Sequence, residues 1–479
     1  MTLLRILLWL GYSFLACAAL MVLTALMGAT QGEMREAALM GVSAVVTGLV
    51  GLLFITATFR AQTRESTAEA ILFLMLFWLV VPIVCCVPFF ALGGTDRLVP
   101  AMFESVSAVT TTGASRLVPE ELPRTLLFWR SLLQYFGGAC TATFAVVILA
   151  ALNLTGTGIH RSALFTFRTG QLFSRLVGIG RLVAAIYLFL AALAFMLMVA
   201  GGTESFDAMC LALSGIGTGG LAPRSGPLAN ILSPFSATVL AVLCVLGAFN
   251  VAIVWDAIRT RRLRMMLRLV THFEHRGLLS MTAMLIIATT VFASLYNFGP
   301  AILDSMFFMS TAAFRYDVVS LDMVPAPILI TLALIGGSAL STAGGVKVIR
   351  LLLLFRHLGT DVARLSHPSR VVPVQFRATR VGDDEFLSIW MYFFGYALCF
   401  ALGALALAAG GLQLEDALAT SAASLANIGP LLELTLPASG LRYSDFTPVQ
   451  MVVSTLLMLV GRVEVLIALS LLLPSTWRQ

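Results

Sequence analysis

The sequence is poor in charge. Of its 479 residues, 11% are Asp, Glu, Lys or Arg, against about 25% in an average soluble domain. Lys347 is the only lysine. So few charges do not cover the surface of a water-soluble protein of this length, and the composition therefore excludes an ordinary soluble domain.

Clustered metal ligands and nucleophile–base pairs are also missing from the sequence. The seven cysteines show no metal-ligand spacing, so we expect small buried side chains rather than a disulfide framework. There is no Walker motif and no phosphorylatable aspartate signature. We therefore expect no enzymatic activity, no ATP hydrolysis by the chain itself and no cofactor.

Apolar residues make up 59% of the chain, and several mostly apolar stretches are long enough to cross a bilayer, which takes about 18–20 residues. Examples are 182–200, 279–292 with its flanks, and 451–473. The first stretch, 3–27, is longer than a signal-peptide core of about 7–15 residues and has no clear cleavage site, so we interpret it as a retained span. The pattern predicts a multi-pass membrane protein.

Basic residues gather in alternate loops, at 60–64, 161–181, 259–276 and 356–380, whereas the opposite loops carry fewer cations and several acids. By the positive-inside rule the basic loops are cytoplasmic. We expect both termini on that side. Since topology accounts for the basic clusters, the net charge of +6 does not indicate nucleic-acid binding.

One pattern recurs four times: a long apolar stretch, a shorter one with an acid near its start and small or polar residues at its end, then a second long stretch. The shorter segments are 101–113, 206–219, 302–313 and 415–429. None is long enough to cross a bilayer. Four old repeats are the simplest explanation.

A half-length helix followed by a glycine-rich stretch predicts a re-entrant loop, because irregular backbone at membrane depth is tolerated only where protein buries it or water reaches it. Helix carboxyl ends are partially negative, and the carbonyls that follow can replace the hydration shell of a cation. We expect Gly113, Gly219, Gly220 and Gly429 to bind the ion, with φ > 0 turning the carbonyls inward. For a single motif, close helix packing is the better explanation; four together favour a pore.

Six segments along nearly the whole chain carry a family resemblance. They are Ser-Val-Ser-Ala-Val-Thr-Thr-Thr-Gly-Ala at 105–114, Phe-Trp-Arg-Ser-Leu-Leu-Gln-Tyr-Phe-Gly-Gly at 128–138, Thr-Gly-Gly-Leu at 218–221, Gly-Gly-Ser-Ala-Leu-Ser-Thr-Ala-Gly-Gly-Val-Lys-Val-Ile-Arg at 336–350, Ala-Asn-Ile-Gly-Pro at 426–430 and Gly-Arg-Val-Glu at 461–464. With these segments the chain resembles the TrkH/KtrB/HKT superfamily of potassium transporters, and the bacterial TrkH type in particular.

The resemblance implies an all-α membrane fold of ten full spans and four pore helices around a central pore. Residues 1–65 are expected to form two extra spans, followed by pore repeats at 66–160, 161–265, 266–370 and 371–479. It places a selectivity filter at Thr111, Thr112, Gly113, Thr218, Gly219, Gly220, Thr311, Ala312, Ala313, Asn427, Ile428 and Gly429, where K⁺ is expected to bind.

An intramembrane gate is the second site that the resemblance implies. Small residues interrupt a span of about thirty mostly apolar positions, so the helix should loosen there; a packing kink is the alternative. The gate residues are expected to be Gly336, Gly337, Ser338, Ser341, Thr342, Gly344, Gly345, Lys347 and Arg462.

Two arginines lie inside apolar spans, where a cation costs at least about 2.5–3.5 kcal/mol unless it is paired or wetted. The resemblance places Arg462 beneath the filter as an electrostatic barrier. We expect Arg130 to be structural, binding either pore-loop carbonyls or Glu104.

The third loop departs from the family pattern, because Thr311-Ala-Ala-Phe314 replaces the usual Thr-Thr-Gly-Phe and Arg315 follows it. Alanine in a left-handed conformation costs about 1–2 kcal/mol, so we expect this loop to turn its carbonyl differently. Arg315 would repel a cation unless Asp317 or another acid neutralises it.

Together these features predict gated, channel-like K⁺ uptake driven by the membrane potential. The alternatives are H⁺ or Na⁺ symport, which needs a titratable acid such as Glu464 or an acid of the four short segments, and a poorly selective or non-conducting member of the family. The resemblance also implies a homodimer resting on a cytoplasmic nucleotide-binding ring of the TrkA or KtrA kind. The basic loops at 259–276 and 356–380 are suited to such a ring or to anionic lipid.

Overall fold

The computed structural model describes residues 2–58, 67–95, 97–151, 172–260, 272–292, 298–317, 321–366, 375–376, 379–380, 383–435 and 440–463. Within these ranges the named secondary-structure elements are helices, apart from one short antiparallel hairpin, β1 (Gln375–Phe376) and β2 (Thr379–Arg380). The predicted repeat boundaries at 65, 160, 265 and 370 lie outside the described residues.

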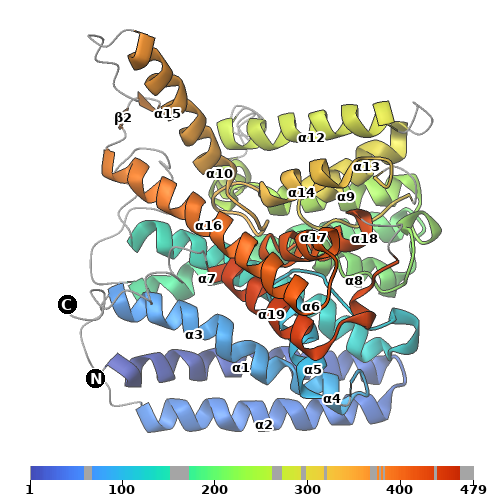
Figure 1. Ribbon diagram of the computed structural model, residues 1–479. Helices are drawn as coiled ribbons and strands as arrows, with labels where there is room; N and C mark the ends of the chain where they lie inside the picture. Colours follow the sequence, from blue (N-terminus) through green and yellow to red (C-terminus); the bar gives the residue numbers. More distant parts are fainter. Residues whose placement is uncertain are drawn as a thin grey trace.

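Two long helices, α1 (Thr2–Thr30) and α2 (Met34–Thr58), precede the repeats and pack side by side at one edge of the molecule (Figure 1). Gly11 and Gly51 allow this close packing, since a side chain on either would meet the backbone carbonyl of the other. Val45 and Leu53 of α2 are more than 60% exposed, as expected for a helix that faces lipid.

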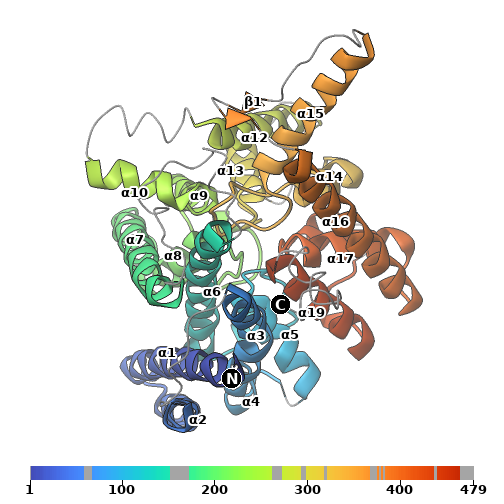
Figure 2. The same cartoon turned by 90° about the vertical axis from the view of Figure 1, so that its left-hand side faces the viewer.

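Four units follow. The first contains α3 (Thr67–Cys85), α4 (Val87–Ala91), α5 (Leu98–Val109) and α6 (Arg124–Ala151); the second α7 (Leu172–Ala200), α8 (Ser205–Ile216), α9 (Pro234–Ala248) and α10 (Val251–Thr260); the third α12 (Phe273–Phe292), α13 (Phe298–Met309), α14 (Ala326–Leu334) and α15 (Val348–Ser366); the fourth α16 (Asp383–Ala409), α17 (Leu414–Leu425), α18 (Leu431–Thr435) and α19 (Pro448–Val463). The short 3-10 turns Pro119–Glu121, Leu228–Asn230 and Tyr443–Asp445 lie in the connections. Figure 2 shows the units following one another around the middle of the molecule.

The four short apolar segments each form a helix of twelve residues: α5, α8, α13 and α17. At 1.5 Å per residue such a helix is about 18 Å long, well short of a bilayer's hydrocarbon core. Each begins in the connection after a long helix and ends among buried residues. We call these four helices the pore helices.

Five described helices are long and apolar enough to cross a membrane: Leu4–Thr30, Met34–Thr58, Leu72–Ala91, Leu176–Ala200 and Ile389–Ala409. The other five predicted spans correspond to α6, α9, α12, the pair α14 and α15, and α19. Helix α6 has 28 residues but contains the polar side chains Arg130 and Gln134, and α9, α12 and α19 are shorter apolar helices. Between α14 and α15 the expected helix is interrupted.

Glycines on the long helices receive the carboxyl ends of three pore helices. A Cβ at Gly137 of α6 would overlap the carbonyl oxygen of Val109. A Cβ at Gly247 of α9 would overlap that of Ile216, and a Cβ at Gly461 of α19 would overlap that of Leu425. These three carbonyls belong to the last residues of α5, α8 and α17. Because no side chain intervenes, the ends of the pore helices reach the middle of the molecule.

Substitution of Gly461 by alanine should destabilise the fold, because the added methyl group would overlap the Leu425 carbonyl and overpacking of this kind costs about 1–3 kcal/mol. Thermal unfolding of the detergent-solubilised protein should show a lower midpoint. Gly41→Ala is the matched control, since no atom lies within 4 Å of the Cβ position at Gly41 of α2. Equal midpoints for the two variants would contradict this packing constraint.

Candidate functional site

The segments that follow the pore helices are 111–113, 218–220, 311–313 and 427–429, which we call filter segments 1 to 4. All are buried except Gly220, which is partly exposed. Segments 4 and 1 are joined by a hydrogen bond of 2.6 Å from Gly429 N to Thr112 O. Side chains on Gly113 or Gly220 would overlap the carbonyl oxygens of Gly219 and Ala312, respectively. The segments therefore meet in the order 4, 1, 2, 3.

The first residue of every filter segment has a left-handed backbone. The φ angles are 54° at Thr111, 54° at Thr218, 67° at Thr311 and 54° at Asn427. Such angles cost about 1–3 kcal/mol each for residues other than glycine and persist only where the surroundings impose them. Their recurrence two residues after each pore helix shows that the four segments share one backbone course.

Positive φ occurs at two of the four glycines expected to bind the ion. Gly113 and Gly220 have φ angles of 80° and 77°, but Gly219 and Gly429 do not have positive φ. Threonine and asparagine occupy the positions where all four segments are left-handed. Gly113 and Gly220 are therefore equivalent, each standing two residues after the left-handed threonine of its segment.

The third segment does not avoid the left-handed conformation. Ala313 has a φ of 48°, which is left-handed. The expectation that alanine would give this loop a different backbone conformation is therefore wrong. Arg315 donates to both carboxylate oxygens of Asp322, at 2.8 and 2.7 Å, so an acid does neutralise this charge. The backbone N–H of Asp317 donates to the Asp304 carboxylate at 3.3 Å.

Buried polar side chains support the segments from behind. Gln134 of α6 donates to the Gly219 carbonyl at 2.7 Å and accepts hydrogen bonds from Ser214 and from Leu221 N–H, at 2.6 and 3.3 Å. The Tyr443 hydroxyl donates to the Gly429 carbonyl at 2.8 Å. Sequence reasoning assigned neither residue a role, although a glutamine inside an apolar span was a signal that could have identified Gln134.

Asn427 ties two filter segments to a long helix. Its side-chain amide donates to the Thr112 hydroxyl at 2.9 Å and to the Met458 carbonyl of α19 at 3.0 Å. The neighbouring Ile428 and the filter residue Ala312 are both fully buried. Side chains and carbonyls of the filter segments are therefore held by the protein from several directions.

Arg462 of α19 joins the base of the filter to the interrupted stretch of the third unit. Its guanidinium donates to the carbonyl of Thr110 and the hydroxyl of Thr111, and also to the Thr342 carbonyl at 2.5 Å. The residue is 8% exposed. This cation lies directly under segment 1, in contact with the predicted gate.

All the predicted gate residues except Arg462, which lies in α19, belong to a non-helical loop between α14 and α15, which we call the intramembrane loop (335–347). Its ends are held together by hydrogen bonds of 2.8 Å, Gly336 N to Val346 O and Val346 N to Leu334 O. Gly345 has φ 70°, and Lys347 donates to the carbonyls of Ala343 and Ser341 at 2.5 and 3.4 Å.

Two sides of the pore hold the intramembrane loop. The broken junction of α9 and α10 accepts hydrogen bonds from Ser338 N and Thr342 N. On the filter side, Gly344 N donates to the Thr311 hydroxyl at 3.2 Å, and the hydroxyls of Thr218 and Thr342 are 3.1 Å apart. Gly337 and Ser341 pack against each other within the loop. The loop therefore closes the space beneath the four filter segments.

A small cavity lies on the other side of the loop. Its lining combines apolar side chains of α3 and α6 with the intramembrane loop, Tyr392 and α19; both cations, Lys347 and Arg462, reach it. Any path through the filter would continue into this cavity once the loop moved.

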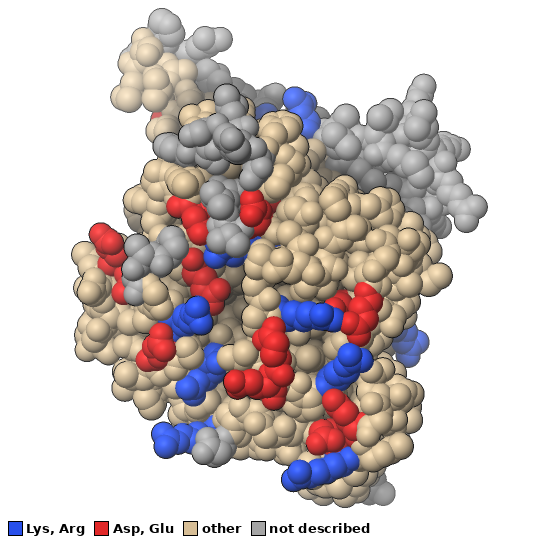
Figure 3. All heavy atoms as spheres, turned by 90° about the vertical axis from the view of Figure 1, so that its right-hand side faces the viewer, with Lys and Arg blue, Asp and Glu red and all other residues tan. Residues whose placement is uncertain are grey.

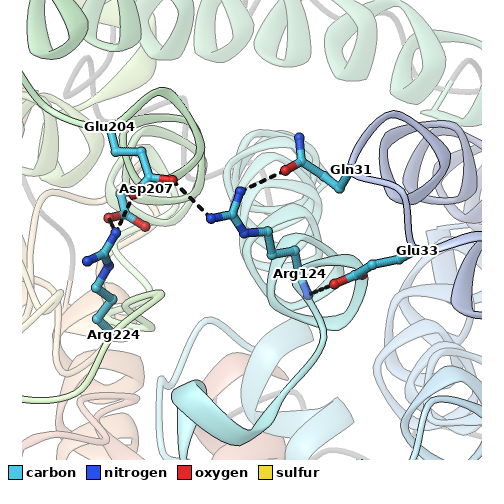
Figure 4. A network of polar contacts seen from close by, with 6 residues as sticks. All are labelled: Gln31, Glu33, Arg124, Glu204, Asp207 and Arg224. Carbon is cyan, nitrogen blue, oxygen red and sulfur yellow. Dashed lines mark hydrogen bonds and ion pairs between the residues drawn. The ribbon is translucent and has the colours of Figure 1, made fainter.

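The face that carries the turn between α1 and α2 has interspersed acidic and basic side chains (Figure 3). Arg124 at the start of α6 lies between that turn and the second unit, with Gln31 on one side and Glu204 on the other (Figure 4). Glu33 accepts the backbone N–H groups of Arg124 and Thr125, each at 2.8 Å, and so caps α6. The N-terminal helices are thereby tied to the first unit.

Arg224, four residues beyond segment 2, pairs with Glu204 and with Asp207 of α8 (Figure 4). Arg116 beyond segment 1 donates to the Ser444 carbonyl at 3.3 Å. Arg315, which follows segment 3, is paired with Asp322. Three of the four filter segments are thus followed by an arginine that has a partner.

Comparison with known proteins identifies the family. The TrkH family, described as "Cation transport protein", matches residues 45–476. The Trk system potassium uptake proteins TrkH of Salmonella typhimurium and Escherichia coli are each 30% identical over 432 residues, 88% of either chain. TrkG of E. coli is 25% identical over 432 residues.

The crystal structure of the potassium transporter TrkH from Vibrio parahaemolyticus superimposes with a TM-score of 0.87 at 26% identity and covers 100% of both chains. This likeness confirms the predicted all-α membrane fold class, and the matches confirm the predicted resemblance. The chain belongs to the TrkH family of cation transport proteins.

Proposed function

We propose that this protein takes up K⁺ across the bacterial inner membrane through a channel-like path formed by the four filter segments. The observation that carries the proposal is the meeting of these segments at the carboxyl ends of four pore helices. Partially negative helix ends favour a cation, and backbone carbonyls can replace its water. The choice of K⁺ rests on the relatives, which are named as potassium uptake proteins.

The driving force in this proposal is the membrane potential, worth about 2.3 kcal/mol per charge per 100 mV. Symport with H⁺ or Na⁺ is the alternative. Of the acids considered for it, those of the pore helices are described, whereas Glu464 lies outside the described residues. Measurement of reversal potentials while pH and Na⁺ vary separates the two: dependence on K⁺ alone supports the channel, and a shift with pH or Na⁺ supports symport.

Gating in this proposal consists of movement of the intramembrane loop away from the filter. The support is its set of contacts: Gly344 with Thr311, and Thr342 with Arg462. Their loss would open the space that leads to the cavity beneath. Arg462 then acts as a barrier whose position depends on the loop.

We further propose that both termini are cytoplasmic and that two copies pair and rest on a nucleotide-binding ring of the TrkA or KtrA kind. Helix α15 projects from the body of the molecule and carries an exposed apolar stripe, Phe355, Leu358, Val362 and Leu365 (Figure 1). Residues three and four positions apart lie on one face of a helix, so this apolar stripe is suited to packing against a helix of a second copy. Most of the basic loops expected to meet the ring or anionic lipid lie outside the described residues.

Uptake of ⁸⁶Rb⁺ into liposomes that contain the purified protein tests transport directly. We expect uptake that K⁺ competes for, and its loss in Gly113→Ala, because the methyl group would overlap the Gly219 carbonyl at a left-handed position. Gly32→Ala makes the same change at a left-handed glycine with open space around it and should retain uptake. Absence of uptake by the wild-type protein would refute the proposal.

Deletion of Thr342, Ala343 and Gly344 should raise the flux, because it removes the loop's contacts with Arg462 and Thr311. We expect about a tenfold increase in the initial ⁸⁶Rb⁺ uptake rate, as for a loss of about 1.4 kcal/mol of contact energy. An unchanged rate in a correctly folded variant would show that the loop does not gate.

Ala313→Gly should increase the preference for K⁺ over Na⁺. Glycine adopts the φ of 48° without the cost that a Cβ imposes, so the third segment can match the first two. Bi-ionic reversal potentials should shift towards higher K⁺ selectivity. An unaltered permeability ratio would mean that position 313 does not limit selectivity.

A further inference from the structure

Two of the pore helices carry a buried carboxylate at equivalent positions. Glu104 of α5 and Asp304 of α13 are 1% and 0% exposed. Each lies seven residues before the left-handed threonine of its filter segment, Thr111 or Thr311. A charge this deeply buried is costly unless hydrogen bonds and other charges compensate it, so its partners indicate what it does.

Those partners are also equivalent. Glu104 accepts the backbone N–H of Arg116 at 2.7 Å, and Asp304 accepts that of Tyr316 at 2.5 Å. Arg116 and Tyr316 both stand three residues after the last residue of their filter segments. Each carboxylate has a further donor: the Ser115 hydroxyl for Glu104, and Asp317 N–H for Asp304. Each therefore ties the outer end of a filter segment back to the pore helix that precedes it.

The other two repeats lack this bond. Leu211 and Thr420 occupy the corresponding positions in α8 and α17. Their segments are held instead by the neutral side chains of Gln134 and Tyr443. Since the segments meet in the order 4, 1, 2, 3, the two carboxylates belong to repeats that are not neighbours, and charged and neutral supports alternate around the filter.

A cationic side chain lies near the first of these carboxylates. The guanidinium of Arg130 is 2% exposed and interacts electrostatically with Glu104, although its Nε and Nη1 have no hydrogen-bond partner among the described residues. In the third repeat, Arg315 is paired with Asp322, while Asp304 accepts backbone N–H groups. Both carboxylates thus make charge-assisted hydrogen bonds, which are about twice as strong as neutral ones.

We propose that Glu104 and Asp304 are a matched pair of positioning residues that set the ion selectivity of filter segments 1 and 3, an inference that rests on the proposed cation transport. Selectivity requires the carbonyl spacing to survive the exchange of one ion for another. The last residue of each segment, Gly113 or Ala313, has a left-handed backbone, and this conformation is strained at Ala313. The bond to the carboxylate fixes the chain three residues beyond it and so prevents the segment from relaxing.

The test compares Glu104→Gln, Asp304→Asn and the double variant in proteoliposomes under bi-ionic K⁺ and Na⁺ conditions. These amides keep the shape of the side chain but lose the charge and one acceptor. We expect the K⁺/Na⁺ permeability ratio to fall about threefold in each single variant and about tenfold in the double, because effects at separate sites add in free energy.

Asp416→Asn is the matched control. Asp416 lies in pore helix α17, is 8% exposed, and makes no hydrogen bond to a filter segment in the part of the chain that the structure describes. Its neutralisation should leave the ratio unchanged. An equal fall in this control would assign the effect to general loss of negative charge and overturn the proposal.

Thermal unfolding midpoints distinguish positioning from folding, because a merely structural role lowers the midpoint without changing the ratio. If the amide variants are not recovered folded, Ser115→Ala and Glu104→Asp decide, since both retain the charge and disturb only the bonding of the Glu104 carboxylate. An unchanged permeability ratio in folded variants overturns this inference and leaves the proposed transport standing. A wild-type protein that moves no cation removes the proposed transport and this inference with it.

Discussion

Backbone that is neither helix nor sheet is tolerated at membrane depth only where other groups satisfy it. In this protein four such stretches meet at one place. Each begins with a residue in a left-handed conformation, directly after a helix too short to cross the bilayer. Glycines on three long helices admit the ends of the short ones. These four stretches have backbone groups that no helix satisfies. The long helices, the buried polar side chains behind the segments and the intramembrane loop supply partners for them.

The repeats share a backbone course but differ in chemistry. Carboxylates hold the first and third segments, whereas an amide and a phenol hold the second and fourth. The third unit differs again, because its second long helix is interrupted and its filter segment contains Ala313 in place of glycine. The four units thus have separate supports at their filter segments, and the third unit supplies the loop that lies beneath them.

Sequence alone predicted the membrane class, the four short helices and the segments that follow them, because apolar length and small-residue endings are local signals. It did not identify the left-handed threonines Thr111, Thr218 and Thr311, since a β-branched side chain gives no local reason to adopt positive φ. Asn427 is of a residue type that adopts this conformation more readily, but nothing in its own segment singles it out. Sequence reasoning also missed Gln134 and Tyr443, whose partners lie 85 and 14 residues away. Contacts of this kind depend on how the repeats meet, which periodicity within one segment does not reveal.

Arg462 contacts both the base of segment 1 and the loop beneath the filter. Its three donors are divided between those two elements. In the proposed gating, withdrawal of the loop would require the guanidinium either to follow it and leave Thr110 and Thr111, or to stay and give up Thr342. Either course breaks hydrogen bonds of the same side chain, so in this proposal the loop cannot move without a change in the surroundings of the charge beneath the filter.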